Sequence, residues 1–463
     1  MTINNKNFHI VSLGCAKNTV DSDSMAQLLI KSGYKSVANP DMAGILIVNT
    51  CGFIATAKEE SRNVLGELAA KKKSGQILIA AGCLTQRYGA DVARDISGID
   101  GIIGTRRWMD VAGVVANLQR VNPPEPRYQL PEAATVGSDE QGALRVSIQG
   151  ASAYLKIADG CRRPCAFCAI PLIKGTIVSR PVETILAEAR ILQERGIHEI
   201  ILIAQDTTDY GYELGLKNGL AHLLKKLCAA VPQVDWIRVM YAYPGFVTDE
   251  LIEVIAKEKQ VVHYLDMPLQ HAHPAVLRRM HRPTNVDWVY KTVEKMRKVI
   301  PDLALRTTFI VGYPGETEAE FQTLLDFIDE LRFDKVGAFK FSFETGTACG
   351  PLGDSVPAEV KEERFNRLME KQQQISLACN KAFVGRKLDV LFEGYGQGVS
   401  IGRSYRDAPE IDGLVLVKGE IPAGQMLPVL INEAMPYDLG GTTVRKKQAL
   451  PKSKNDRRIQ FHG

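Results

Sequence analysis

The sequence predicts an α/β protein with three domains: an N-terminal parallel α/β sheet, a central partial (βα)6 barrel and a small C-terminal antiparallel β-barrel. Three observations support this prediction. Short apolar runs alternate with helical patterns in two stretches of the chain, and a third stretch holds short glycine-bounded runs without helices. The 463 residues also match about three domains at ~150 residues each.

The first domain, residues 1–119, contains three apolar runs that are each followed by a helical pattern. The runs are 9–14 (HIVSLG), 44–50 (GILIVNT) and 76–82 (QILIAAG). This βαβαβα order is typical of a parallel sheet. Residues 120–146 contain four prolines and little periodicity, which indicates a linker.

The central domain, residues 147–381, contains six apolar runs with helical patterns between them. The runs are 153–158, 199–205, 236–244, 263–270, 304–312 and 335–342. Six units are two short of the eight that close a full barrel, so we expect an open, partial barrel. A polar helix over 358–380 ends this domain.

The last domain, residues 382–444, changes to short strand-like runs at 388–394, 413–419 and 426–434, separated by glycines. This pattern predicts a small antiparallel barrel. Residues 445–463 carry seven Lys or Arg and one acid, so we expect a flexible basic tail.

The composition is that of a globular protein, with 45% hydrophobic and 24% charged residues and a mean hydropathy of -0.08. No apolar run approaches the ~18 residues that span a bilayer, and the start, MTINNKNFHIVSL, lacks the features of a signal peptide. We therefore expect a cytoplasmic protein without a membrane partner. In that reducing compartment its nine cysteines would be thiols or metal ligands.

Three cysteines form a C-x3-C-x2-C motif directly after the first strand of the central domain. They are Cys161, Cys165 and Cys168 in ADGCRRPCAFCAIP. Three thiolates so close in sequence can hold three irons of a 4Fe–4S cluster and leave the fourth iron free to bind a substrate or cofactor. The alternative is a structural zinc site, but the next histidine is His198, with no cysteine between.

Three more cysteines, Cys15, Cys51 and Cys83, each follow one strand of the N-terminal sheet. The carboxyl ends of neighbouring parallel strands share one edge, so these thiols should converge and hold a second 4Fe–4S cluster. The alternative is three separately buried thiols, because free cysteine packs well as a small apolar residue. The remaining cysteines show no such pattern and are expected to be packing residues: Cys228, Cys349 and Cys379.

The loop of residues 161–168 after the first strand of a partial barrel resembles that of radical S-adenosylmethionine (SAM) enzymes. With the N-terminal cysteines and a C-terminal barrel similar to a TRAM domain, residues 1–444 resemble the methylthiotransferase family. Five segments are similar to the branch that modifies an aspartate of a small-subunit ribosomal protein of the S12 type. They are GCAKNTVDSDSM (14–25), YAYPG (241–245), DMPLQHA (266–272), RTTFIVGYPGET (306–317) and DAPEIDG (407–413). The branch that methylthiolates adenosine in transfer RNA is the alternative.

The resemblance implies two 4Fe–4S clusters, SAM as cofactor and an external electron donor. The open iron on the second group of cysteines would chelate SAM, whose reductive cleavage gives a 5'-deoxyadenosyl radical. That radical would take hydrogen from the β-carbon of the target aspartate, a step beyond side-chain acids and bases. The cluster on the N-terminal cysteines would carry the sulfur that is methylated and transferred.

Further candidate site residues lie near the ends of the barrel strands, where functional residues of βα barrels collect. We expect cofactor binding by Gln205, Asp206, Tyr243, Arg306 and Gly312, and catalytic roles for Gln270 and His271. The alternative is that these residues only cap helices or satisfy the backbone of loops.

The charge pattern favours a basic protein partner over RNA. The whole chain carries +4, but the tail accounts for +6 of it, so residues 1–444 are slightly acidic. Residues 382–444 hold five basic and eight acidic residues, which is unfavourable for contact with phosphates. RNA contact by the tail remains open. So do two other classes of protein, a ribosome- or RNA-binding protein with structural clusters and an electron-transfer protein.

Overall fold

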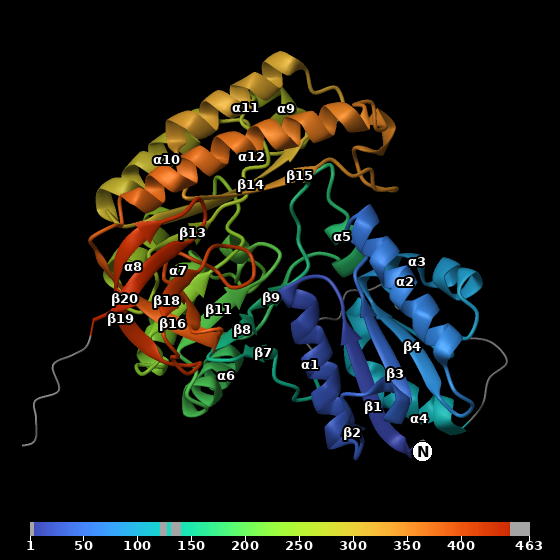
Figure 1. Ribbon diagram of the computed structural model, residues 1–463. Helices are drawn as coiled ribbons and strands as arrows, with labels where there is room; N and C mark the ends of the chain where they lie inside the picture. Colours follow the sequence, from blue (N-terminus) through green and yellow to red (C-terminus); the bar gives the residue numbers. More distant parts are fainter. Residues whose placement is uncertain (1–3, 121–126, 131–139, 445–463) are drawn as a thin grey trace, which may run out of the picture.

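A six-stranded parallel sheet forms the N-terminal part of the computed structural model, which describes residues 4–120, 127–130 and 140–444 (Figure 1). Its strand order is β2-β1-β3-β4-β5-β6. The strands are β1 (Asn4–Ser12), β2 (Lys35–Ser36), β3 (Ala43–Thr50), β4 (Ile77–Gly82), β5 (Gly101–Gly104) and β6 (Arg127–Gln129). All eight residues of β3 are buried, as expected for a central strand of a parallel sheet covered on both faces.

Helices cover this sheet on both sides, which confirms the predicted βα alternation. They are α1 (Ala16–Lys31), α2 (Ala55–Lys71), α3 (Cys83–Asp95) and α4 (Val111–Arg120), with 3-10 turns η1 (Pro40–Met42) and η2 (Thr105–Asp110). Part of the predicted linker, 120–146, lies outside the described residues. The described segment Arg127–Gln129 pairs with β5 and so extends the sheet by one strand.

The central domain contains the six parallel strands that the sequence predicts. They form two ladders, which an isolated parallel bridge between Ile237 and Val261 connects. The strands are β8 (Ser152–Lys156), β11 (Glu199–Ile203) and β12 (Trp236–Val239) in one ladder, and β13 (Tyr264–Asp266), β14 (Ala304–Val311) and β15 (Lys335–Lys340) in the other. The antiparallel strand β7 (Val146–Gln149) flanks β8, so this edge of the partial barrel does not close onto β15.

The helices of the central domain pack their apolar faces onto these strands. Phe309 of β14 and Leu324 of α11, for example, are both fully buried in the largest hydrophobic core. The helices are α5 (Ile170–Lys174), α6 (Val182–Glu194), α7 (Gly219–Ala230), α8 (Asp249–Lys257), α9 (Pro274–Arg279), α10 (Val286–Val299), α11 (Glu318–Leu331) and α12 (Ala358–Lys381). Short elements β9 (Ala158–Asp159), β10 (Val178–Ser179), η3 (Thr207–Asp209) and η4 (Gly350–Leu352) complete the domain.

The C-terminal domain is a closed five-stranded barrel, in agreement with the prediction of a small β-barrel. Its strands are β16 (Lys387–Gly396), β17 (Val399–Ser404), β18 (Val415–Lys418), β19 (Met426–Ala434) and β20 (Leu439–Thr443). Four of the five pairings are antiparallel and the pairing of β18 with β20 is parallel. The predicted tail, 445–463, lies outside the described residues.

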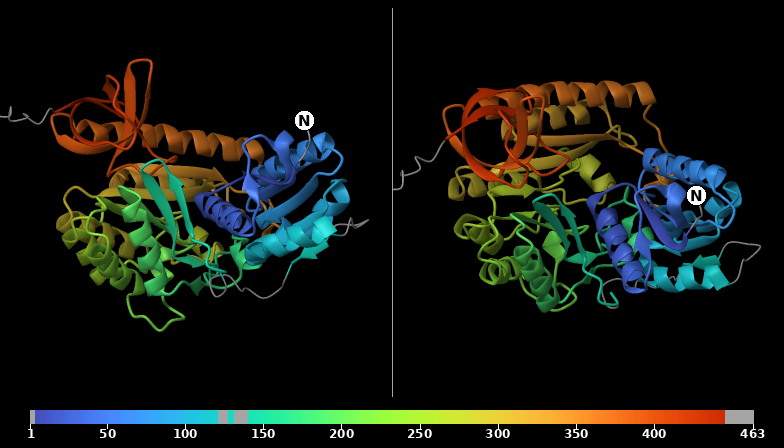
Figure 2. Two further views of the ribbon diagram at one scale, coloured as in Figure 1. Left: turned by 90° about the horizontal axis from the view of Figure 1, so that it is seen from below. Right: turned by 60° about the horizontal axis from the view of Figure 1, so that its bottom comes forward.

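The N-terminal domain and the C-terminal barrel both pack against the central domain (Figure 2). Helix α1 packs against β7 and β8, and α3 packs against α5. The C-terminal barrel contacts the amino ends of the central strands, where Arg403 pairs with Glu199 at 2.7 Å and Asp407 pairs with Lys335 at 2.7 Å. The carboxyl ends are left free to face the N-terminal domain. Among the described helices, none combines the length and the apolar character required for a membrane span.

Candidate functional site

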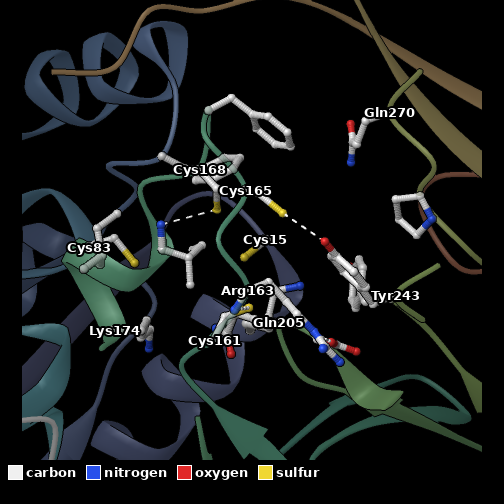
Figure 3. Close-up of a pocket in the computed structure, with 18 of the residues that line it drawn as sticks. Cys15, Cys83, Cys161, Arg163, Cys165, Cys168, Lys174, Gln205, Tyr243 and Gln270 are labelled. Atoms are coloured by element: carbon white, nitrogen blue, oxygen red, sulfur yellow. Dashed lines mark hydrogen bonds and ion pairs between the residues drawn. The ribbon is translucent and has the colours of Figure 1, made fainter. Parts of the chain in front are cut away.

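All six cysteines of the two predicted groups line one cavity of about 410 Å³ (Figure 3). In the N-terminal domain Cys15 directly precedes α1, Cys51 follows β3 and Cys83 begins α3 after β4. Their convergence is visible at Gly14, where an added Cβ would lie 2.9 Å from Cys51 Sγ. These three thiols therefore lie at one edge of the sheet, where the strand ends predict them.

The second group of cysteines lies on the loop between β9 and α5, and the surrounding chain donates hydrogen bonds to its sulfurs. The backbone N–H of Arg163 donates to Cys161 Sγ at 3.4 Å, and that of Ile170 donates to Cys168 Sγ at 3.5 Å. The guanidinium of Arg282 donates to Cys165 Sγ at 3.4 Å. Such donors stabilise thiolates and tune the potential of an iron–sulfur cluster.

Two backbone contacts fix this loop in the central domain. The N–H of Ala166 donates to the carbonyl of Met280 at 2.9 Å, and the N–H of Cys349 donates to the carbonyl of Ala166 at 2.9 Å. Cys349 is buried, with only 1% of its surface exposed. Its backbone thus supports the loop, while its own thiol lies outside the lining of the cavity.

Burial shapes the acidity of these thiols. Burial above all, together with the neighbouring thiols, raises the pKa of Cys83 and of Cys168 to about 12 and that of Cys161 to about 11. Burial likewise raises the pKa of Cys51. Without a bound cation these four thiols would therefore keep their protons at neutral pH, and metal binding must release them.

The donor set fits an iron–sulfur cluster in each group. Each group supplies three thiols at one wall of the same cavity, and thiolate is the ligand that such clusters prefer. Within the described part of the chain, no three or more His, Cys, Asp or Glu side chains are grouped as ligands of one ion. The thiolates of a four-iron cluster bind different irons, so they need not share one ion.

Two arginines lie over the ring of Tyr243 beside the second group. The guanidinium carbons of Arg163 and Arg282 are 4.6 Å and 4.3 Å from the ring centroid, and the Cys165 thiol donates to the Tyr243 hydroxyl at 3.8 Å. Arg163 is neutralised by Asp206 at 2.6 Å. Arg282 is 8% exposed, and within the described chain it has no ion pair and no hydrogen-bond partner for its Nε. A buried guanidinium of this kind can bind a carboxylate.

Ten of the thirteen candidate site residues line this cavity. Besides the six cysteines they are Gln205, Asp206, Tyr243 and Gln270. Figure 3 shows Tyr243 and Gln270 on one side and Cys83 on the other. Gln270 adopts a positive φ of 74°, and its N–H donates to the carbonyl of Thr308 at 2.8 Å.

Three candidates lie outside the lining of the cavity and have other partners. Arg306 pairs with Asp266 at 2.9 Å and with Asp412 at 3.4 Å. Gly312 faces Lys361, whose Cγ would lie 2.3 Å from an added Cβ. His271 is 2% exposed, and its Nδ1 accepts the N–H of His273 at 3.0 Å.

Lys17, Arg163 and Arg282 line the cavity but are not among the residues that the sequence predicts there. Lys17 lies with its Nζ 3.3 Å from the ring centroid of Tyr241, a residue with a positive φ of 62°. Arg163 lies inside the C-x3-C-x2-C motif, so motif context could have indicated it. Arg282 lies far along the chain, and only the fold brings it to Cys165.

Comparison with protein families identifies three regions of similarity. Residues 7–104 match the Uncharacterized protein family UPF0004, residues 155–328 match the Radical SAM superfamily, and residues 384–444 match the TRAM domain. A protein of Chloroflexus aurantiacus named "Ribosomal protein uS12 methylthiotransferase RimO" is 48% identical over 94% of this chain and 99% of its own length. The protein of the same name from Herpetosiphon aurantiacus is 47% identical over 94% of this chain and 100% of its own length.

Among solved structures, the radical S-adenosylmethionine methyltransferase TsrM of Kitasatospora setae has a similar fold. The two share a TM-score of 0.56 and 12% identity, covering 88% of this chain and 79% of TsrM. At 12% identity this similarity shows a shared fold and nothing further.

Proposed function

Because the chain belongs to the family of ribosomal protein uS12 methylthiotransferases, we propose that it converts one aspartate of that small-subunit protein to its β-methylthio derivative. It is a radical SAM transferase that uses an iron–sulfur cluster and SAM. The observation that supports this reaction best is the convergence of six cysteines from two domains on one cavity. A sulfur-inserting enzyme needs a radical-generating group and a sulfur-carrying group next to the same substrate.

We assign one 4Fe–4S cluster to Cys161, Cys165 and Cys168, with its open iron for SAM. A second cluster would be held by the three N-terminal cysteines. When bound, these groups supply radical chemistry at an unactivated carbon, which no side chain provides. The chain's own residues position the reactants and keep water away from them.

The residues around the cavity suit these tasks. Arg163, neutralised by Asp206, and the Tyr243 ring form one wall beside Cys165. Gln205 lines the same cavity, and its Oε1 has no hydrogen-bond partner in the described structure, so it can accept a bond from a bound molecule. Arg282 can hold a carboxylate, which both SAM and an aspartate substrate carry.

Iron analysis tests the cluster count. We expect about eight irons per chain from two four-iron clusters, and about four after Cys161, Cys165 and Cys168 are all replaced by Ala. Full retention of eight irons in that triple variant would refute the assignment.

Methylthiolation of adenosine in transfer RNA is the second candidate, and the C-terminal barrel argues against it. Of the five basic residues in 382–444, Arg403 and Arg406 are 1% exposed and paired with Glu199 and Asp334. The other three basic side chains are exposed, and one of them, Arg386, is paired with Asp302 at 2.8 Å, so few positive charges remain for phosphates.

Mass spectrometry of cells that lack the gene separates the two reactions. We expect the ribosomal protein to lose the mass of one methylthio group while the nucleosides of digested transfer RNA stay unchanged. The reverse pattern would overturn the proposal. Four further points stay predictions: an external electron donor, a cytoplasmic location, the domain boundaries and RNA contact by residues 445–463.

A further inference from the structure

A buried group of charged side chains joins the N-terminal domain to the central domain. Its centre is Asp21 of α1, which is 1% exposed. One carboxylate oxygen contacts Lys156 Nζ and lies 2.5 Å from Arg145 Nη2, and the other lies 2.8 Å from Lys174 Nζ. All three cations are at most 3% exposed, so these contacts are shielded from water.

The three cations come from separate segments of the central domain and of the residues directly before it. Arg145 precedes β7, Lys156 ends β8 and Lys174 ends α5. Asp159 binds the same three cations at 3.1 to 3.3 Å. A single carboxylate of the N-terminal domain therefore completes a cluster whose other members lie in the central domain or directly before it.

The wider cluster is balanced in charge. Arg180 pairs with Glu140 and Glu188 at 2.6 Å, and Arg145 Nε lies 3.9 Å from Glu140. With these residues the cluster has as many carboxylates as cations. Loss of the Asp21 charge would leave one buried cation without compensation, which is costly in a shielded place.

Asp21 and Lys174 connect the two groups of cysteines by a short path. Helix α1 begins at Ala16, directly after Cys15, and Asp21 lies in its second turn. Helix α5 begins two residues after Cys168 and ends at Lys174. The 2.8 Å ion pair between Asp21 and Lys174 therefore joins α1, which follows Cys15, to α5, which follows Cys168.

We propose that Asp21 is a positioning residue that holds the two cysteine groups at the separation required for transfer of sulfur to the substrate. This inference rests on the proposed function and its two clusters. Other contacts hold the domains together without Asp21: Glu344 pairs with Lys58 at 2.8 Å and with Arg87 at 2.6 Å, and Arg106 Nε donates to the carbonyl of Ile173 at 2.8 Å. Loss of Asp21 should therefore shift the domains relative to each other without separating them.

The test compares wild type with Asp21→Asn, both with reconstituted clusters. We expect the variant to keep its iron and to release 5'-deoxyadenosine within about twofold of wild type, since the central site is intact. Formation of the methylthio product should fall about 100-fold, because a misplacement of ~1 Å has effects of this size. Electron paramagnetic resonance of the reduced protein should show a changed magnetic interaction between the two clusters, which a purely stabilising residue would not alter.

Two further variants keep the test decisive. Lys156→Met removes one of the three ion pairs of Asp21 from the central side, at a residue that does not line the cavity, and should lower the ratio of methylthio product to 5'-deoxyadenosine in the same direction. Asp407→Asn is the matched control, because Asp407 is also a buried interdomain carboxylate paired with a lysine, at 2.7 Å from Lys335. It should leave the ratio of methylthio product to 5'-deoxyadenosine unchanged.

The inference is overturned if Asp21→Asn keeps the wild-type product ratio, if product and 5'-deoxyadenosine fall together, or if the magnetic interaction is unchanged. A wild-type protein that binds about eight irons but gives no methylthio product would refute the proposed function instead. The resonance comparison would then still decide whether Asp21 sets the spacing of the clusters.

Discussion

Gly14 is the residue at which backbone geometry constrains the N-terminal cysteines most directly. It adopts a φ of +91°, which L side chains rarely adopt. An added Cβ would lie 2.8 Å from Cys51 Cβ and 2.9 Å from its Sγ. Glycine is therefore required here for two reasons, the backbone conformation and the space taken by a proposed cluster ligand.

Gly14→Ala should displace Cys51 and impair the N-terminal cluster. We expect reconstituted protein to bind about four irons instead of about eight, because the central cysteines are untouched. Iron analysis of the purified variant measures this directly.

Gly33→Ala is the matched control for that measurement. Gly33 has a similar φ of +84°, but an added Cβ would meet no atom within 4 Å outside its chain neighbours. It carries the backbone strain without the steric conflict and should bind iron as wild type does. Equal iron contents in the two variants would contradict the steric argument.

At the scale of single elements, α11 shows how local sequence defines a helix start. Thr317 Oγ1 accepts the N–H of Glu320 at 3.3 Å, and the Glu320 carboxylate accepts the N–H of Thr317 at 2.8 Å, which is a complete capping box. The Glu320 carboxylate also binds Arg279 at 2.9 Å. The cap thus links α11 to α9 beside it.

Thr317→Ala should lower the free energy of unfolding by about 1 kcal/mol, the usual effect of losing such a cap. Urea denaturation followed by circular dichroism measures the change. Thr323→Ala in the same helix is the control, because Thr323 is half-buried in mid-helix and its hydroxyl donates to the carbonyl of Ala319 within the helix, so it caps no helix end. A loss of equal size in both variants would exclude the cap as the cause.

The sequence predicts elements well where apolar periodicity is strong and poorly where glycine interrupts it. All six central strands and the helix over 358–380 occur as predicted. The strands β17 and β20 were not predicted, because VSIGRS and LGGTT contain glycine and few apolar residues. Barrel closure, a long-range property, holds these segments extended.

The site shows the same division between local and long-range information. The cysteines are predictable because strand ends of parallel units must converge. Arg306 was expected near the cavity, yet it is the third of eight residues in β14 and so lies about 17 Å from the strand's carboxyl end at ~3.3 Å per residue. Arg282 reaches Cys165 only through the tertiary fold.

At the scale of the whole molecule, Glu199 connects the C-terminal barrel to the central domain. It is fully buried and pairs with Arg403 and Arg238 at 2.7 Å each. Burial acts to raise the pKa of Glu199, but Arg403 and then Arg238 outweigh it and lower the pKa to about 2. The ion pairs therefore stabilise the folded state only while Glu199 is charged.

This linkage predicts an acid-sensitive domain contact. A carboxylate whose pKa is lowered by folding stabilises the folded state fully above its unfolded pKa of 4.5. It loses this stabilisation as the pH falls toward 2. The free energy of unfolding should fall by about 3 kcal/mol over this pH range. Urea denaturation of the cluster-free chain at several pH values measures it.

Glu199→Gln is the variant that isolates this contribution. It should be less stable than wild type at pH 7, because Arg238 loses its charged partner and Arg403 keeps only Glu393, but its stability should vary less between pH 4.5 and pH 2. Glu253→Gln serves as the control, since its ion pair with Lys257 is solvent-exposed and contributes little. Parallel pH curves for wild type and Glu199→Gln would refute the assignment.

The outer surface of the C-terminal barrel carries more acidic than basic side chains, and this determines which partner it attracts. Arg403 and Arg406 are buried in ion pairs, whereas Asp389, Glu420 and Glu433 are exposed. An acidic surface favours association with a basic ribosomal protein and disfavours contact with phosphates. Neutralising the exposed acids should therefore weaken binding to a basic protein and strengthen binding to RNA.

Combined replacement of these acids, Asp389→Asn with Glu420→Gln and Glu433→Gln, should weaken binding to the isolated basic protein about tenfold at low salt, at up to ~1 kcal/mol per exposed charge. The difference from wild type should shrink as salt is added, because screening removes the same attraction. A control triple variant at three exposed acids outside the barrel, Glu67, Glu183 and Asp249, should bind as wild type does. Tighter binding of the barrel variant to small ribosomal subunits would instead mean that this surface faces RNA.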